Sequence, residues 1–399
     1  MTQQGSAPRV DRTVLLVSMA AFASMASMRA CDSMLPKLAE EFSVSVGTAA
    51  QMISAFALAY GLLQIFYGPL GDRHGKQRVI AFAAVGCALT NLVIAFSPSL
   101  RWAVGWRAVA GAAAGGIIPV SLALIGDLVA YEERQAVLAR LLVAVNFGLI
   151  SGQWLAGVAA DLVGWRAVFV ALALCFAGVS WPLLATAGAR PAALAPGAKG
   201  PGSYLAQLRQ VLQVRWARWV LVAVGVEGVF AFSAFSFVPS FLHHEFGLSL
   251  SSAGAVMALY GVGGLMYAGS ARFLIPSLGE RGLVGVGAAC LALALAALAL
   301  CSAWTWAVPA CLLGGLGIYM LHATLQTHAT QMLPQLRGTA VSVFVVCLFG
   351  GQAIGVTAGA SVVDWASARW VFAAGALVVP LLGLWFNLGL AQRANWALQ

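Results

Sequence analysis

The chain consists largely of apolar runs of about twenty residues separated by short polar segments, and this pattern limits the folds open to it. Such a run is long enough for a helix to cross the hydrocarbon core of a bilayer. In lipid, backbone polar groups must be satisfied within the structure, so crossing segments are helices or closed barrels. Only 9% of the 399 residues are charged, against about 25% in soluble domains. The sequence therefore predicts a helical integral membrane protein.

Twelve runs of this kind are present, and the first is too long for a signal-peptide core, so we expect it to remain as a span. The runs are Thr13–Leu35, Thr48–Tyr67, Val79–Phe96, Trp102–Val129, Ala136–Ala159, Ala167–Ala187, Trp219–Leu242, Ser252–Leu274, Gly282–Ser302, Trp304–Gln326, Thr339–Val362 and Trp370–Leu390. With the N-terminus inside, sixteen of the 22 basic residues fall in inner loops and tails. They are Arg9, Arg12, Arg73, Lys76, Arg78, Arg134, Arg140, Arg190, Lys199, Arg209, Arg215, Arg218, Arg272, Arg281, Arg337 and Arg393. Because cytoplasmic loops are rich in Lys and Arg, both termini are predicted to be cytoplasmic.

The two halves of the chain are related by a repeat with an offset of 203 residues. The matching pairs are Pro36 and Pro239, Gly111 and Gly314, Arg134 and Arg337, Arg166 and Arg369, and Phe169 and Phe372. We therefore predict two six-helix bundles, residues 1–187 and 219–399, in the same orientation. They are joined by an inner linker, 188–218. Its second part, Ser203–Arg218, has a basic and an apolar face and suits a helix on the inner leaflet.

A charged loop of eleven residues joins the second and third runs. The glycines and charged residues that define its pattern are Gly68, Asp72, Arg73, Gly75, Lys76 and Arg78. It resembles the cytoplasmic loop motif of the major facilitator superfamily, Gly-x-x-x-Asp-Arg-x-Gly-Arg-Arg, with Gln77 in place of one Arg. The resemblance implies an all-α membrane fold of twelve helices in two pseudo-symmetric six-helix bundles. It also implies that the loop and Asp127 latch the inner helix ends while the outside is open. Asp72 is expected to begin the next helix and cap it. An ordinary basic flanking loop is the other interpretation.

Charges inside the spans carry the chemistry, because an embedded ionisable group is costly and is a functional hypothesis by default. Arg29 and Asp32 lie three residues apart in the first run and so share a helix face. Arg29 lies about 24 Å into that span. We expect Asp32 to exchange a proton and Arg29 to hold it ionised or to meet a substrate anion. A purely structural ion pair within the helix is the alternative.

Glu227 lies about 12 Å into the seventh run and has no basic residue near it in sequence. We expect an unpaired carboxyl group that exchanges a proton or binds a cation. A Glu that only hydrogen-bonds a neighbouring helix is the alternative. Phe232 and Phe235 stand at the repeat positions of Arg29 and Asp32, so the second half offers aromatic surface where the first offers charge. These rings could equally face lipid.

Two further motifs resemble those of the antiporter branch of the superfamily. Arg107 followed by Gly111 in the fourth run resembles its embedded Arg motif, which implies a role in proton coupling and permits a contact with Asp32. Gly148, Gly152 and Gly157 in the fifth run resemble its Gly-rich motif in part, since Gln153 replaces the usual Pro. Such small residues also let membrane helices pack closely, and we expect that role for all four Gly residues.

The tenth run places three polar side chains about a turn apart. They are Tyr319, His322 and Gln326. We expect substrate or proton contacts from them, although a packed polar His is an equal alternative. The seven Cys residues are scattered singly, so neither a disulfide framework nor a metal site is predicted. We expect no cofactor. We also expect no nucleic-acid partner, because the excess of Lys and Arg over Asp and Glu lies in the inner loops.

Three functions compete. The first is a proton-driven antiporter that exports a small amphipathic compound, as the antiporter-branch resemblance implies. The second is an importer of the same fold, a proton symporter or uniporter. The third is a membrane-embedded enzyme or sensor, against which stands the lack of a metal cluster, nucleophile elbow or phosphate loop in the sequence. We favour the first, with a monomer in the cytoplasmic membrane of a bacterium, since the chain is rich in Ala and Gly. The sequence does not name the substrate.

Overall fold

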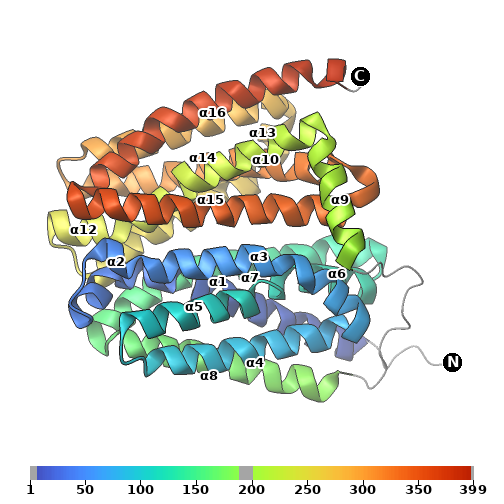
Figure 1. Ribbon diagram of the computed structural model, residues 1–399, viewed down its shortest axis with the longest axis horizontal. Coiled ribbons are helices and arrows are strands. Elements are labelled where there is room, and N and C mark those ends of the chain that lie inside the picture. Colours follow the sequence, from blue (N-terminus) through green and yellow to red (C-terminus); the bar gives the residue numbers. More distant parts are fainter. Residues whose placement is uncertain (1–6, 188–200, 397–399) are drawn as a thin grey trace.

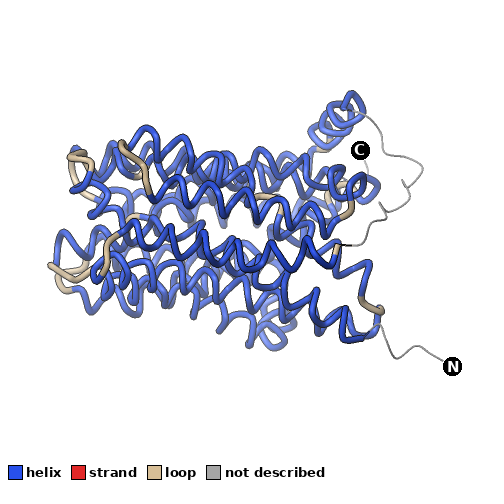
Figure 2. The backbone as a smooth tube through the Cα atoms, turned by 90° about the horizontal axis from the view of Figure 1, so that it is seen from below, coloured by secondary structure: helices blue, strands red, loops and turns tan. Residues whose placement is uncertain are grey.

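The computed structural model describes residues 7–187 and 201–396, and within these ranges it contains helices and no strands. The helices run roughly parallel in two layers, with the first half of the chain below and the second above (Figure 1). Short loops gather at the two ends of the molecule (Figure 2). The all-α membrane fold predicted from the apolar runs is confirmed.

The first bundle holds α1 (Ala7–Glu41), α2 (Val46–Ala49), α3 (Gln51–His74), α4 (Lys76–Ala95), α5 (Leu100–Ala114), α6 (Ile117–Leu128), α7 (Tyr131–Leu162) and α8 (Trp165–Thr186). After the linker helix α9 (Pro201–Gln213), the second bundle holds α10 (Arg215–Glu227), a π-helical turn (Gly228–Phe232), α11 (Ser233–Ser236), α12 (Val238–Phe246), α13 (Leu250–Leu300), α14 (Ala307–Gln331), α15 (Arg337–Trp365) and α16 (Ala368–Trp396). Two single 3-10 turns, Trp304–Trp306 and Pro334–Leu336, precede α14 and α15.

The number of membrane crossings depends on α13. Eleven helical stretches of the described chain are long and apolar enough to cross a membrane. One of them, α13, has 51 residues. A helix of that length spans about 76 Å, more than twice the apolar core of a bilayer. Gly279 interrupts it with a φ of 60°, which L-residues with a side chain rarely adopt. Two crossings therefore lie within α13, and the structure agrees with twelve spans.

The charged loop is much shorter than predicted. Helix α3 continues through most of it to His74 and α4 begins at Lys76, so Gly75, with a φ of 91°, alone separates them. Asp72 lies in the last turns of α3, and α4 has no side-chain cap. The prediction that Asp72 begins and caps the next helix is wrong. A helix can carry polar residues beyond the bilayer core, because its backbone groups remain satisfied there.

The predicted linker helix also ends earlier than expected. Residues 188–200, the first part of the linker, lie outside the described residues. Helix α9 stops at Gln213, so Arg215–Arg218 belong to α10 and not to an inner-leaflet helix. Helix α9 runs across the ends of the spans (Figure 1), and Thr339 Oγ1 donates a hydrogen bond to Gln207 Oε1 at 2.6 Å. The linker helix is thereby tied to the start of α15.

The two bundles meet along two helix pairs, α3 with α15 and α7 with α13. Close approach depends on Gly residues, as predicted. A Cβ atom at Gly111 would strike the backbone of α3, and one at Gly148 or Gly152 the backbone of α1. Gly157 faces the backbone of α13 in the other bundle. We name the end of the molecule that holds Gly75 and α9 the basic end, and the opposite end the far end.

Substitution of Gly152 by Val tests this packing. The added side chain would overlap the α1 backbone, and such overpacking costs about 1–3 kcal/mol. We expect a lower unfolding temperature for the detergent-solubilised protein. Gly178→Val in α8 is the matched control, because nothing lies within 4 Å of a Cβ atom there. Equal unfolding temperatures for the two variants would show that α1 and α7 do not need this close contact.

Candidate functional site

Helix α1 carries a buried ion pair. Arg29 Nη1 donates to Asp32 Oδ2 at 3.1 Å, and the two residues are 4% and 0% exposed. Each keeps an atom that makes no hydrogen bond within the described chain, Arg29 Nε and Asp32 Oδ1. The pairing on one helix face is as the sequence predicted. The spare atoms are what a site needs in order to accept a further group.

Arg107 on α5 is buried beside this pair but does not bond to it directly. Its Nη1 donates to the Ser27 carbonyl oxygen at 3.1 Å and its Nε to the Met52 carbonyl oxygen at 3.3 Å. The guanidinium lies 4.1 Å from the centre of the Phe56 ring. It is still close enough to act electrostatically on Asp32. The contact with Asp32 that the motif permits is therefore not a hydrogen bond, because the guanidinium donates to carbonyl oxygens of α1 and α3.

Glu227, at the end of α10, is fully buried and is paired. His322 Nδ1 on α14 lies 2.9 Å from Glu227 Oε2. The prediction of an unpaired carboxyl group was wrong, since tertiary packing brings in a partner 95 positions away. The other oxygen, Oε1, has no hydrogen-bond partner in the part of the molecule that is described.

The π-helical turn begins directly after Glu227 and carries the aromatic side chains of the site. Such turns in membrane and soluble helices are frequent at functional positions. The Phe232 ring packs against the His322 ring with centroids 5.5 Å apart. Phe235 is fully buried and packs against Tyr260 of α13 at 4.7 Å. Both rings therefore line the polar cluster and do not face lipid.

Polar residues of both bundles meet at Tyr319. Its hydroxyl donates to Asn146 Oδ1 of α7 at 2.7 Å, which is a hydrogen bond between the bundles. Tyr260 of α13 packs against Phe235, and its buried hydroxyl has no partner among the described residues. Sequence analysis missed Tyr260 and Asn146, since uncharged polar residues in a span are common. Gln326 is exposed and is not drawn into this cluster.

At the basic end, the predicted ionic contact of the loop is present. Lys76 Nζ donates to Asp127 Oδ2 at 2.5 Å and lies 3.8 Å from Asp72 Oδ1. A cleft of about 420 Å³ lies beside them, lined by Gly68, Asp72 and Lys76 of the first bundle and by the start of α15 in the second. The bundles are thus separated by open space at this end.

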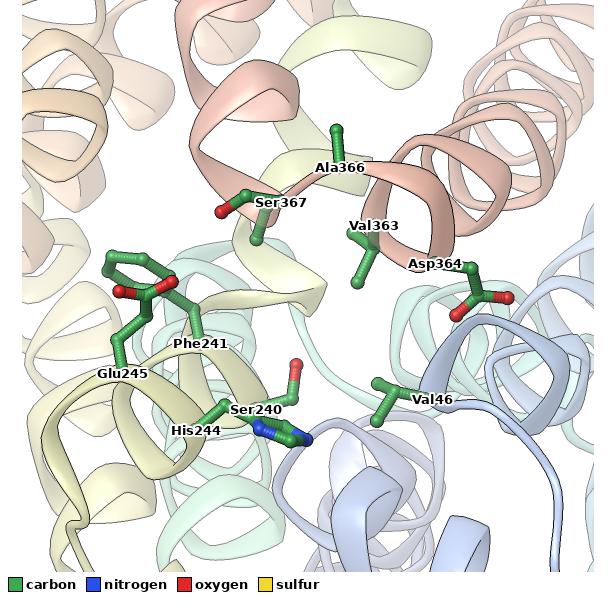
Figure 3. A pocket seen from close by; sticks show the side chains of 10 residues that line it. Val46, Ser240, Phe241, His244, Glu245, Val363, Asp364, Ala366 and Ser367 are labelled. Carbon is green, nitrogen blue, oxygen red and sulfur yellow. The ribbon is translucent and has the colours of Figure 1, made fainter.

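At the far end the bundles are instead joined. Asp161, near the end of α7, accepts hydrogen bonds from the backbone N–H groups of Leu250 and Ser251 at the start of α13, at 3.3 and 2.7 Å. Asp364, near the end of α15, accepts from Gly47 N at 2.8 Å and from Ser45 Oγ at 2.5 Å at the start of α2. Asp364 and Val46 border a cavity of about 310 Å³ on this face (Figure 3). The polar cluster is therefore enclosed at the far end.

Comparison with known proteins finds transporters of one superfamily. The family model described as Major Facilitator Superfamily matches residues 17–356. The chain is 25% identical over 237 residues to an uncharacterised transporter of that type, YceJ of Bacillus subtilis, covering 58% of this chain and 59% of YceJ. It is 30% identical over 141 residues to the multidrug efflux pump LfrA of Mycolicibacterium smegmatis, covering 34% and 27%. These matches span less than two thirds of either relative.

A solved structure resembles the whole molecule. The nucleoside transporter NupG superposes with a TM-score of 0.79 at 13% identity, over 93% of this chain and 99% of that one. At this identity the likeness establishes the fold alone.

The contact between Glu227 and His322 predicts a strong thermodynamic coupling. Replacing His322 by Leu leaves a buried carboxyl group without its partner, which costs about 1–3 kcal/mol. The same change should cost much less when Glu227 is already Gln. Unfolding temperatures of the two single variants and the double variant measure this coupling. Additive losses would mean that the two side chains are neighbours without an interaction that matters for stability.

Proposed function

The chain belongs to the major facilitator superfamily of transporters, and we propose that it exports a small amphipathic compound in exchange for protons by alternating access. It is a multi-pass membrane transporter and not an enzyme. Export is supported by the relationship to the efflux pump LfrA. The fold is shared with a nucleoside transporter, so family membership leaves the direction open.

One observation carries the proposal of proton coupling: a fully buried carboxyl group in each bundle, each beside a basic partner. Asp32 is bonded to Arg29, and Glu227 is bonded to His322. Each carboxyl group also keeps an oxygen without a hydrogen bond in the described structure. A buried carboxyl group exchanges a proton according to the charges around it, so binding of a charged substrate changes its proton affinity. Arg107 contributes to that field at Asp32.

The substrate would bind between the bundles, where α1, α10, α13 and α14 bring their polar side chains together. The residues proposed to contact it are Arg29, Asp32, Glu227, Phe232, Phe235, Tyr319 and His322. Aromatic rings on the second bundle would accept the apolar part of an amphipathic molecule. The charged groups would orient its polar part.

We assign the basic end to the cytoplasm of a bacterial cell because Lys and Arg are concentrated there. The cleft at this end and the contacts of Asp161 and Asp364 at the other support the proposal of an inward-facing state. Rocking of the bundles would close the cleft and bring Asp72 to the N-terminus of α15, which favours an acidic group. The residues of this inner latch would be Gly68, Asp72, Arg73, Gly75, Lys76, Arg78 and Asp127.

Import by proton symport or by uniport is the second candidate. The same buried carboxyl groups would serve a symporter, in which proton and substrate move together. The two candidates differ in the direction of substrate flux under an imposed proton gradient, and in whether such a gradient is needed at all.

Asp32→Asn should abolish substrate-dependent proton movement. The measurement uses proteoliposomes with a pH-sensitive dye inside, an imposed proton gradient, and a panel of lipophilic cations, organic anions and zwitterions. We expect a compound that dissipates the gradient with the unaltered protein and not with Asp32→Asn or Glu227→Gln, because an amide cannot carry the proton. Labelled compound should move against the proton flux.

The matched control is Glu132→Gln, an exposed acidic residue in the first turn of α7, which should transport normally. Thermal unfolding of each variant separates lost coupling from lost folding. Full proton coupling in well-folded Asp32→Asn and Glu227→Gln would contradict the mechanism. Flux of compound in the same direction as protons would favour symport.

A further inference from the structure

We propose that the transported compound is a zwitterion, with its anionic group bound by Arg29 and Tyr260 and its cationic group by Glu227. This inference rests on the proposed function, because it concerns the same site. It names the charge pattern of the substrate and adds Tyr260 as a binding residue.

Three buried atoms without hydrogen-bond partners in the described structure carry the argument. They are Arg29 Nε and the Tyr260 hydroxyl, which can donate, and Glu227 Oε1, which can accept. Each side chain is at most 4% exposed. Buried polar groups are nearly always paired, so three such atoms in one cluster indicate a missing partner. Asp32 Oδ1 is a fourth such atom, on a carboxyl group that is proposed to take up a proton. A partner that offers two acceptors and one donor would satisfy the other three.

The packing around Tyr260 brings the helices of the three side chains together. A Cβ atom at Gly254 of α13 would lie 3.1 Å from Ser33 Oγ of α1, and the Tyr260 ring lies 4.7 Å from the ring of Phe235, eight positions after Glu227. The positive pole therefore lies on α1 and the negative pole on α10, with the phenol of α13 between them. The neighbouring Phe235 ring packs on Tyr260 and provides an apolar wall.

When Asp32 and Glu227 are ionised, the charges of the site suit a substrate that carries one positive and one negative group. In the first bundle, Arg29 and Arg107 exceed Asp32 by one positive charge. In the second, the Glu227 carboxyl group lies 2.9 Å from His322 Nδ1 and is the acidic group of the site. A purely cationic substrate would lie beside the surplus positive charge, and a purely anionic one beside the Glu227 carboxylate. A zwitterion matches both poles, which matters most where water is excluded.

The test compares the three charge forms of one carbon skeleton by calorimetric titration of the purified protein, without a proton gradient. The probes are 8-aminooctanoate, octylamine and octanoate, and tryptophan with its methyl ester and its N-acetyl derivative. For at least one skeleton, the zwitterion should bind tenfold or more tightly than either analogue, about the value of one charge-assisted hydrogen bond. Equal affinities, tighter binding of a singly charged form, or no binding of either zwitterion would overturn the proposal.

Single substitutions test which residue binds each charged group of the zwitterion. Arg29→Gln should reduce the affinity for the zwitterion to that for the amine, and Glu227→Gln to that for the carboxylate. Tyr260→Phe should weaken binding of the zwitterion and the anion but not of the cation. Arg101→Gln and Glu132→Gln, both at exposed positions, are the controls. If the unaltered protein binds the zwitterion but moves no protons with it, only the proposed export mechanism is contradicted.

A second, independent observation concerns the far end, where we infer that Asp161 and Asp364 form a paired outer latch. Each lies near the end of a helix in one bundle and caps the start of a helix in the other. An acidic side chain at a helix N-terminus satisfies free N–H groups and opposes the helix dipole. The far end cannot open unless these contacts break.

The two caps are related by the internal repeat. Asp161 and Asp364 differ by 203 positions, and so do the residues whose N–H groups they accept, Gly47 and Leu250. Both carboxylates are exposed, so water can replace the lost hydrogen bonds when the bundles separate. The latch is therefore symmetric and reversible.

Asp161→Ala, Asp364→Ala and the double variant test the latch by hydrogen–deuterium exchange of the intact protein. The ratio of outward-open to inward-open molecules should rise about fivefold for each cap removed, the usual value of an N-cap. Exchange should increase at the starts of α2 and α13. It should also decrease around the basic-end cleft, at residues 64–72 and 337–342, which simple fraying at the far end would not produce.

Two controls give this test its direction. Glu133→Ala, an exposed acidic residue at the other end of α7, should leave the ratio unchanged. Asp72→Asn, in the proposed inner latch, should shift the molecule the opposite way. Unchanged exchange at the basic-end cleft in the double aspartate variant would overturn the latch. That result would not affect the zwitterion site, which is measured by binding.

Discussion

Exclusion of water from the bilayer core is the constraint on which the rest of this structure depends. A polar group placed there must find its partner within the protein, and the chain shows how this is achieved. The Arg107 guanidinium is held by carbonyl oxygens of two neighbouring helices and the face of an aromatic ring. Glu227 finds an imidazole on a distant helix. Against this background, unpaired atoms on the charged and phenolic side chains Arg29, Glu227 and Tyr260 support a site for a further group.

The fold follows from sequence patterns that are local or strictly repeated. Apolar runs predict spans, and the 203-residue offset predicts two similar bundles. Helix ends were less predictable, because polarity marks the edge of the membrane and not the end of a helix, as α3 shows by continuing through Asp72 to His74. The same reasoning explains the long α13, where the break is a single Gly at position 279.

The site was predictable in its charges and not in its pairings. Arg29 and Asp32 are neighbours on one helix, so their contact could be inferred from spacing. The partner of Glu227 and the contact of Tyr319 with Asn146 arise from packing between helices far apart in the chain. Tyr260 gave no signal at all, since its importance lies in having no hydrogen-bond partner in the described structure, a property that no sequence pattern records.

The internal repeat is kept at the ends of the molecule and broken in its centre, and the two regions have different proposed roles. At the far end the repeat is kept down to the capping contacts of Asp161 and Asp364, and such symmetry suits two bundles that must separate and close together. At the basic end each bundle also has an ionisable pair between two of its helices, Lys76 of α4 with Asp127 of α6 and Glu280 of α13 with His328 of α14, although the residues differ. In the centre the repeat is broken, since Phe232 and Phe235 replace the charges of Arg29 and Asp32. Two identical faces would offer a ligand the same charge twice. Two unlike faces, one positive and one negative with aromatic walls, can orient a molecule with two different ends, and a site of that kind must be asymmetric even in a symmetric fold.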